Sequence, residues 1–205
     1  DSHKATWNRL FAAGSLVTTI AQGWMLGAYV TGFQTDLWSR LFSAGIALTL
    51  PAAYAMLGVG WLLMKTEGDL QRKAQRWGQR VLWPMGLALV GISLATPVVS
   101  QTVFDKWFVL PEFFALLPIP LACVAAFLAI RHVLATPRVV AAGYGWIVFA
   151  ATVVIFLLAF FGLAYSIYPY IVIDRMTVWD AASSTESLAV IAVGTAITLP
   201  AIVVY

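Results

Sequence analysis

A single stretch, Tyr54–Arg80, constrains the fold more than any other part of the chain. It is apolar and uncharged as far as Met64, and its basic residues then outnumber Glu67 and Asp69. These basic residues are Lys65, Arg72, Lys73, Arg76 and Arg80. An uncharged helix that runs into a short basic segment is typical of a transmembrane helix that ends in the cytoplasm. We therefore predict a cytoplasmic basic loop at residues 65–80.

The composition supports a membrane protein. Of the 205 residues, 61% are hydrophobic and 10% are charged, whereas soluble domains carry roughly 25% charged residues. The small net charge of +3 does not indicate nucleic acid, because the basic residues lie where membrane topology requires them. The single cysteine, Cys123, lies in an apolar run, so a disulfide framework is excluded and a buried thiol is expected.

Six apolar runs are long enough to cross the hydrocarbon core, which takes roughly 20 helical residues. They are expected at about residues 10–33, 41–64, 81–103, 113–130, 139–167 and 187–205. In lipid the backbone must satisfy its own hydrogen bonds, and these runs are too long and too unalternating for barrel strands. The predicted fold class is an all-α polytopic membrane protein without a sheet, forming a single transmembrane helical domain over residues 1–205. The fifth run is long, so it is tilted or its first part emerges from the membrane.

Charge sets the expected orientation. With the N-terminus inside, the inside segments hold Lys4, Arg9, Lys65, Arg72, Lys73, Arg76, Arg80, Arg131 and Arg138, whereas the outside holds Arg40, Lys106 and Arg175. Cytoplasmic segments carry the excess of Lys and Arg, so this orientation is favoured. Residues 168–186 then form an extracytoplasmic loop. Within the basic loop, Asp69–Arg80 is expected to form a short surface helix with Leu70, Ala74, Trp77 and Val81 near one face.

No ionisable side chain lies well inside a predicted span, so an ion or proton path through these helices is not expected. Arg40, Glu112 and Arg131 lie at span ends, where they anchor the helices at the interface. The only histidines, His3 and His132, lie in a tail and at a helix end and cannot converge on one metal. We therefore predict no catalytic residue and no metal ligand in this chain, and we assign no cofactor-binding residue.

The polar residues expected inside the spans are Thr18, Thr19, Gln22, Ser43, Thr49, Ser93, Thr96 and Thr152. Gln22 is the most notable of them. A hydrogen bond to a neighbouring helix is its expected role, and contact with a quinone or a water chain is the alternative. Nearby, the Gly23-x-x-x-Gly27 pair favours close helix approach.

Three stretches together resemble a known family. Residues 21–29 read AQGWMLGAY, residues 54–58 and 61–68 read YAMLG and WLLMKTEG, and residues 176–183 read MTVWDAAS. In order and spacing these resemble subunit II of the cytochrome bd ubiquinol oxidases, a family that includes a cyanide-insensitive branch. The resemblance covers nearly the whole chain.

This resemblance implies a subunit of a quinol:oxygen oxidoreductase in the inner (plasma) membrane of a prokaryote. The complex couples quinol oxidation to reduction of dioxygen to water in the respiratory chain, and it translocates protons by vectorial chemistry. Haem b, haem d and the quinol-oxidising loop are expected in the partner, cytochrome bd subunit I, and this chain is expected to bind none of these cofactors. The chain begins without Met and ends in an apolar run, so we expect it to be part of a longer subunit that lacks the family's N-terminal third.

The same motifs also have local structural interpretations. Lys65 favours the negative end of a helix dipole, and Gly68 is a plausible residue just past that helix. Asp180 or Ser183 is expected to cap the last span, and Glu186 follows Ser183 at capping-box spacing.

Two other classes of function remain as alternatives, a transporter domain and a structural membrane subunit. Transporters place discontinuous helices and buried polar groups at mid-membrane, and this sequence has prolines but no mid-span charge. For an oxidase subunit, the sixth span is expected to pack against subunit I. Its small residues include Ala189, Ala192, Gly194 and Ala196, and such residues allow close helix contact.

Overall fold

The computed structural model describes residues 2–99, 101–108, 110, 114, 116–173 and 175–204. Its helical elements are α1 (Ser2–Val30), α2 (Leu37–Lys65), α3 (Gly68–Val99), α4 (Gln101–Phe108), α6 (Pro118–Ala135), α7 (Pro137–Val139), the π-helical η1 (Val140–Tyr144), α8 (Trp146–Ile167) and α9 (Thr185–Val204). Two strands, β1 (Tyr170–Val172) and β2 (Met176–Thr177), lie between α8 and α9. Six of the described helices, α1, α2, α3, α6, α8 and α9, are long and apolar enough to cross a membrane. The predicted all-α polytopic fold is confirmed.

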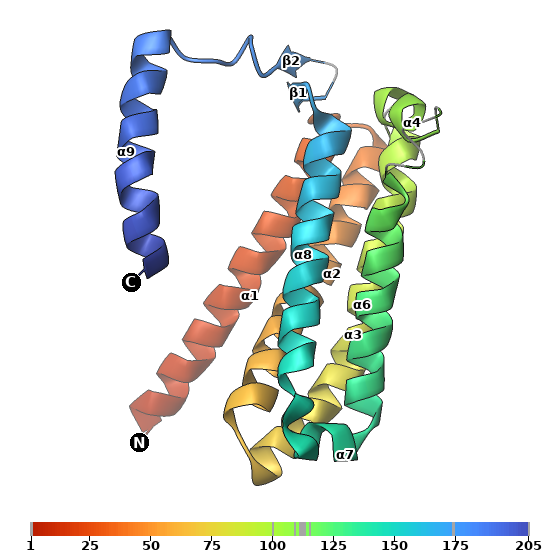
Figure 1. The fold of residues 1–205 in the computed structure, drawn as a ribbon, viewed down its shortest axis with the longest axis vertical. Coiled ribbons are helices and arrows are strands. Elements are labelled where there is room, and N and C mark those ends of the chain that lie inside the picture. Colours follow the sequence, from red (N-terminus) through yellow and green to blue (C-terminus); the bar gives the residue numbers. More distant parts are fainter. Residues whose placement is uncertain are drawn as a thin grey trace.

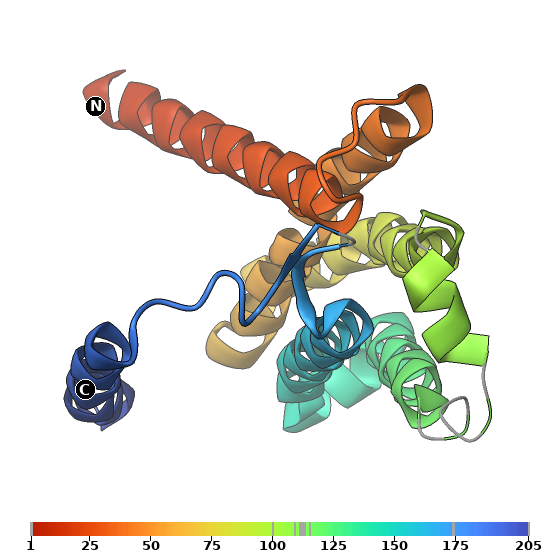
Figure 2. The ribbon, with the colours of Figure 1, turned by 90° about the horizontal axis from the view of Figure 1, so that it is seen from above.

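The helices α2, α3, α6 and α8 form a bundle, and α1 leans across α2 (Figures 1 and 2). Successive spans run in opposite directions, so the N-terminus, the α2–α3 turn and α7 lie at the same end (Figure 1). The main core lies inside this bundle and is formed by Met56, Val59, Leu63, Ala74, Leu82, Met85, Ile130, Val133, Leu134, Val140, Val148 and Ile155. Its residues are aliphatic or methionine, as expected where spans pack through van der Waals contact.

The basic segment differs from the predicted loop. Helix α2 ends at Lys65 and α3 begins at Gly68, so most of residues 65–80 belong to the first turns of one long helix. The buried face of these turns contains Ala74 and Gln75, whereas Leu70 and Trp77 are 44% and 46% exposed. The helix continues because its small residues pack directly on the neighbouring spans, which a separate surface helix could not do.

Three span boundaries also differ from expectation. The third span ends at Val99 and is followed by the short helix α4, where a loop was expected. The fourth begins at Pro118, because proline fits the first turn of a helix, and continues to Ala135. Glu112 and Phe113 lie outside the described residues. The predicted fifth span is divided, because Gly143 has a φ of 89° that a continuing helix cannot accommodate.

The loop after α8 contains a small antiparallel sheet where no sheet was expected. Tyr170 pairs with Thr177, and Val172 pairs with Met176. Ile173 packs beside these strands with Val103 and Ile167 in a second, smaller core. The Trp107 indole Nε1 donates to the Ser166 hydroxyl oxygen at 2.9 Å. Apolar and β-branched residues at 170–173 favour extended structure once they lie outside the membrane run.

Candidate functional site

The first sequence motif lies where α1 crosses α2. Gly23 and Gly27 allow the close approach, since a Cβ added to Gly23 would lie 2.6 Å from the Ala47 Cα. A Cβ added to Gly27 would overlap the backbone of Ser43. The small-residue pair predicted from the sequence therefore does bring two helices together.

Gln22 hydrogen-bonds to a neighbouring helix, as expected. The Tyr54 hydroxyl donates to its Oε1 at 3.2 Å. The Tyr54 ring also stacks on Phe156 of α8, with ring centres 5.8 Å apart and planes 3° from parallel. The contacts link α1, α2 and α8 on an exposed side of the bundle. The sequence indicated Gln22 but not Tyr54, because nothing local connects residues that are 32 positions apart.

The in-span hydroxyls are mostly satisfied within their own helices. Each of the following donates to the carbonyl oxygen four residues earlier: Thr19, Ser43, Thr49, Thr96 and Thr152. Such bonds satisfy a hydroxyl in lipid without any partner helix. Gln22 therefore stands out among the polar residues listed from the sequence, because its side chain bonds to another span.

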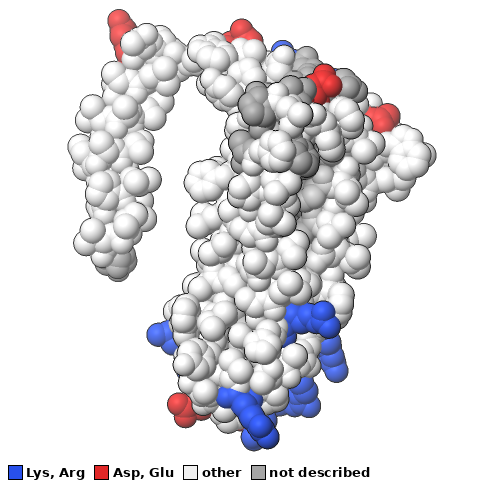
Figure 3. Space-filling view, turned by 45° about the vertical axis from the view of Figure 1, so that its right-hand side comes forward, with Lys and Arg blue, Asp and Glu red and all other residues white. Residues whose placement is uncertain are grey.

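Basic side chains gather at one end of the molecule, and acidic ones lie mainly at the other (Figure 3). At the basic end, the Lys65 ammonium lies 5.4 Å from the centre of the Trp61 ring. The Arg131 guanidinium lies 5.9 Å from the centre of the Trp83 ring. Cations over tryptophan faces are attracted by the ring quadrupole, and Trp is enriched at membrane interfaces. Both pairs have the composition expected where spans leave the hydrocarbon core, and interface anchoring by Arg131 stays a prediction.

The third motif forms a structured turn that leads to α9. The Asp180 carboxylate accepts hydrogen bonds from the Thr177 backbone N–H at 3.0 Å and from the Thr177 hydroxyl at 2.6 Å. These donors favour the charged carboxylate and hold the pKa of Asp180 below its usual value. Trp179 packs edge-on against Tyr168, with ring centres 6.1 Å apart. The motif therefore fixes the geometry of the connection between α8 and α9.

Both capping predictions need correction. The Asp180 carboxylate bonds within its own turn. The residue that caps α9 is Ser184, one residue after Ser183. Its hydroxyl oxygen accepts from the Ser187 backbone N–H, with oxygen and nitrogen 3.4 Å apart. Gly68 has a positive φ of 67° but opens α3, and α2 ends at the extended residue Thr66.

At the other end of α2, Asp36 is a cap that the sequence prediction missed. The Ser39 hydroxyl and backbone N–H donate to it and lower its pKa.

Helix α9 stands apart from the other five spans (Figures 1 and 2). None of its described residues is buried. Its side chains are mostly apolar, and Ala192 and Ala196 lie one turn apart on one face. An apolar span without packing partners in its own chain offers its full surface for contact with another protein.

The sequence predicted no metal ligand in this chain, and its two histidines, His3 and His132, lie on different helices, α1 and α6. Among the described residues, no three His, Cys, Asp or Glu side chains lie close enough to hold a metal ion. His132 is an exposed residue in the last turn of α6. The buried Met56 and Met85 lie in the packed aliphatic core of the bundle. These residues do not fit a haem site, and the absence of a metal ligand in this chain stays a prediction.

A comparison with known protein families gives one match over residues 1–205, to the model described as cytochrome bd terminal oxidase subunit II. None of the curated proteins and none of the solved structures compared with the chain matches it.

Proposed function

Because the chain belongs to the cytochrome bd terminal oxidase subunit II family, we propose that it is the non-haem subunit of a complex that oxidises quinol and reduces dioxygen to water. Membership makes it a multi-pass subunit of a terminal oxidase in a respiratory chain. In the proposed reaction, quinol loses electrons and protons to become quinone. Dioxygen takes up electrons and protons to become water, and vectorial proton release and uptake across the membrane conserve the energy.

We propose that haem b, haem d and the quinol site lie in subunit I. The described residues of this chain support that division, because its histidines lie at helix ends and its bundle core is aliphatic. No Asp, Glu, Lys, Arg or His lies in the middle of α2 or α8 among the described residues. The chain therefore contributes to the complex chiefly as a rigid membrane partner, not as a source of redox ligands.

Helix α9 is the observation that carries the proposed heterodimer. Close packing is what holds spans together in lipid, and none of the described residues of α9 is packed within this chain. The turn from Thr177 to Asp180 holds the connection that leads to it. We infer that subunit I packs on the face of Ala192 and Ala196, where a neighbouring backbone can approach closely.

Substitution on this face tests the heterodimer. Ala192→Trp and Ala196→Trp should each reduce the yield of subunit I that co-purifies with this chain. Ala201→Trp is the matched control, because residue 201 lies on the opposite side of the helix from residue 192. Equal recovery of subunit I from all three variants would contradict the assignment. The yield of this chain in the membrane fraction shows whether each variant still inserts.

We propose that the complex lies in the prokaryotic inner membrane, with its basic end in the cytoplasm. Support comes from the segregation of charge in Figure 3 and from the Lys and Arg count, which is nine on the predicted inside and three on the predicted outside.

The helices α2 and α3 continue through Pro51, Pro84 and Pro97. The transporter alternative is therefore not favoured, since its site would require spans that break at mid-membrane.

A further inference from the structure

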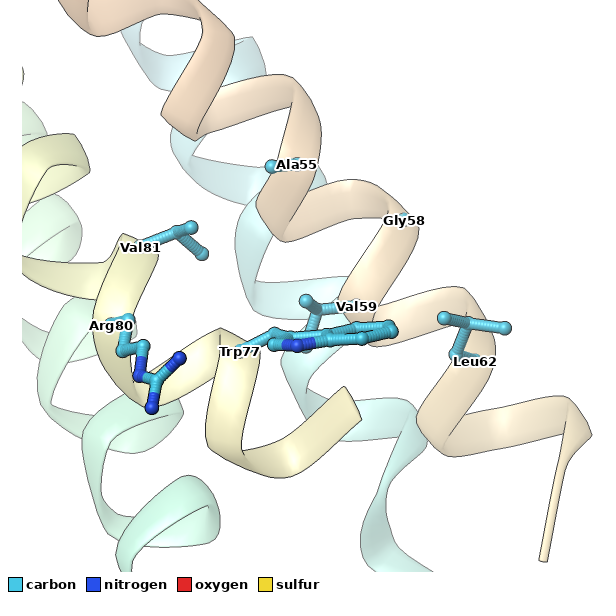
Figure 4. Close-up of a pocket in the computed structure, with 7 residues that line it drawn as sticks. All are labelled: Ala55, Gly58, Val59, Leu62, Trp77, Arg80 and Val81. Carbon is cyan, nitrogen blue, oxygen red and sulfur yellow. The ribbon is translucent and has the colours of Figure 1, made fainter. Parts of the chain in front are cut away.

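A pocket of about 380 Å³ opens between α2 and α3 near the basic end (Figure 4). On α2 its wall includes Ala55 and Gly58, which are exposed and leave a hollow on the helix surface. On α3 the Trp77 ring reaches across toward Val59 and Leu62 of α2 (Figure 4). The cavity is apolar except at one edge, so it accepts a hydrocarbon chain.

The polar edge of this α2–α3 pocket carries positive charge. Arg80 lines it and makes no ion pair with any described residue, the one such pair being that of Arg72 with Asp69 at 2.6 Å. Lys73 precedes Trp77 by four residues and Arg80 by seven, so these basic side chains share one side of α3. Arg80 is exposed, so its guanidinium is available to a negative group from outside the described chain.

Arg80 lies among residues that are typical of the membrane interface. In sequence it lies between Trp77 and Trp83, and Trp83 is covered by the Arg131 guanidinium. Across the pocket, the Trp61–Lys65 contact marks the end of α2. Both pairs are typical of the interface between hydrocarbon and headgroups. A phosphate at this level would meet the Arg80 guanidinium, and its acyl chain would enter the pocket from the bilayer.

We propose that the α2–α3 pocket binds one anionic phospholipid from the leaflet at the basic end. One acyl chain lies against Ala55, Gly58 and Val81, and the phosphate bonds to Arg80. Lys73 adds attraction for a second negative group or for the net charge of the headgroup. Basic pockets between transmembrane helices are known to bind anionic headgroups, and Arg binds phosphate in a planar, two-pronged geometry. A neutral quinone ring would leave the Arg80 charge uncompensated.

The chain provides two variants that block this site in different ways. Gly58→Leu fills the apolar part, and it should fold because nothing lies within 4 Å of the added Cβ. Gly45→Leu is its matched control, since Gly45 is on the same helix, has equally free space and lies outside the pocket. Arg80→Gln removes the charge at the phosphate. Arg72→Gln is its control, because the Arg72 side chain is 71% exposed and already paired with Asp69.

The test uses the intact complex in nanodiscs made from equal parts of phosphatidylglycerol and phosphatidylcholine, followed by detergent extraction and native mass spectrometry of retained lipid. Wild type, Gly45→Leu and Arg72→Gln should retain phosphatidylglycerol in preference to phosphatidylcholine. Arg80→Gln should reduce that preference about fivefold, because each basic residue contributes about 1 kcal/mol of attraction to anionic lipid. Gly58→Leu should abolish lipid retention at this site.

Equal retention of the two lipids by the wild type would overturn the proposal. So would unchanged retention in Gly58→Leu and Arg80→Gln, which would assign the lipid to another surface. Retention of a quinone that is lost only in Gly58→Leu would identify the pocket as a quinone site instead. None of these outcomes depends on whether the complex oxidises quinol, so the result is separate from the test of the proposed function.

Discussion

The Gln75 side-chain amide donates a hydrogen bond of 2.8 Å to the carbonyl oxygen of Leu134. The Gln79 amide donates to the same oxygen at 2.7 Å. Leu134 lies in the last turn of α6, where backbone carbonyls have no partner within the helix. Two amides from α3 thus satisfy the end of α6, and Gln75 is only 7% exposed.

Gln75→Leu should destabilise the subunit by about 1–3 kcal/mol, the usual cost of leaving a buried polar group without its hydrogen bond. Gln79→Leu should cost less, because Gln79 is exposed and Gln75 still bonds to Leu134. Thermal unfolding of the detergent-purified complex measures both. Equal melting temperatures for wild type and Gln75→Leu would show that the contact contributes nothing.

Gly27→Leu should separate α1 from α2, because a Cβ at that position overlaps Ser43. Overpacking of this kind costs about 1–3 kcal/mol, and the variant should melt at a lower temperature. Gly14→Leu is the matched control on the same helix, since nothing lies within 4 Å of its added Cβ. Similar destabilisation by both variants would mean that the α1–α2 crossing is not the cause.

The proposed orientation is tested by labelling introduced cysteines with a membrane-impermeant reagent. Gln75 lies in the basic segment but is buried, so Lys73→Cys is the better probe, in a Cys123→Ala background. It should be labelled only after spheroplasts are permeabilised, whereas Arg175→Cys in the exposed turn of the hairpin should be labelled in intact spheroplasts. The reverse pattern would place the basic end outside the cell.

His132→Ala should leave the reduced-minus-oxidised haem spectrum of the complex unchanged. The side chain lies in the last turn of α6 and is exposed, away from the buried core. Optical spectra at equal protein concentration, with co-purification of subunit I as a check on assembly, provide the measurement. Loss of a haem band from an assembled complex would show that this chain does bind haem.

Hydropathy and charge were sufficient to predict six spans and their alternating direction. Insertion in lipid depends on the mean hydropathy of each segment and on the Lys and Arg content of the segments between spans. Details that depend on one contact were not predictable. The sequence placed Leu70, Ala74, Trp77 and Val81 near one face of a surface helix, yet Trp77 is 46% exposed and the buried face contains Ala74, Gln75 and Gly78. A Cβ added to Gly78 would lie 2.8 Å from the Leu134 side chain of α6. The length of the fifth run indicated that it tilts or that its first part emerges, but not that the helix breaks at Gly143.

The candidate site was predicted only in part for the same reason. The Gly23 and Gln22 signals are local, so the close crossing and a hydrogen bond between helices were foreseen. Tyr54 was not assigned as the partner, because the sequence does not encode which turn of α2 meets Gln22. The α2–α3 pocket likewise depends on how Trp77 lies across two helices, which no spacing rule provides.

The most direct test of the central claim is purification of the complex through an affinity tag on this chain in mild detergent, followed by a reduced-minus-oxidised spectrum. The account predicts haem absorption that co-purifies with a larger subunit, together with oxygen consumption when quinol is added. A colourless assembly that contains only copies of this chain, with no oxygen consumption, would contradict it.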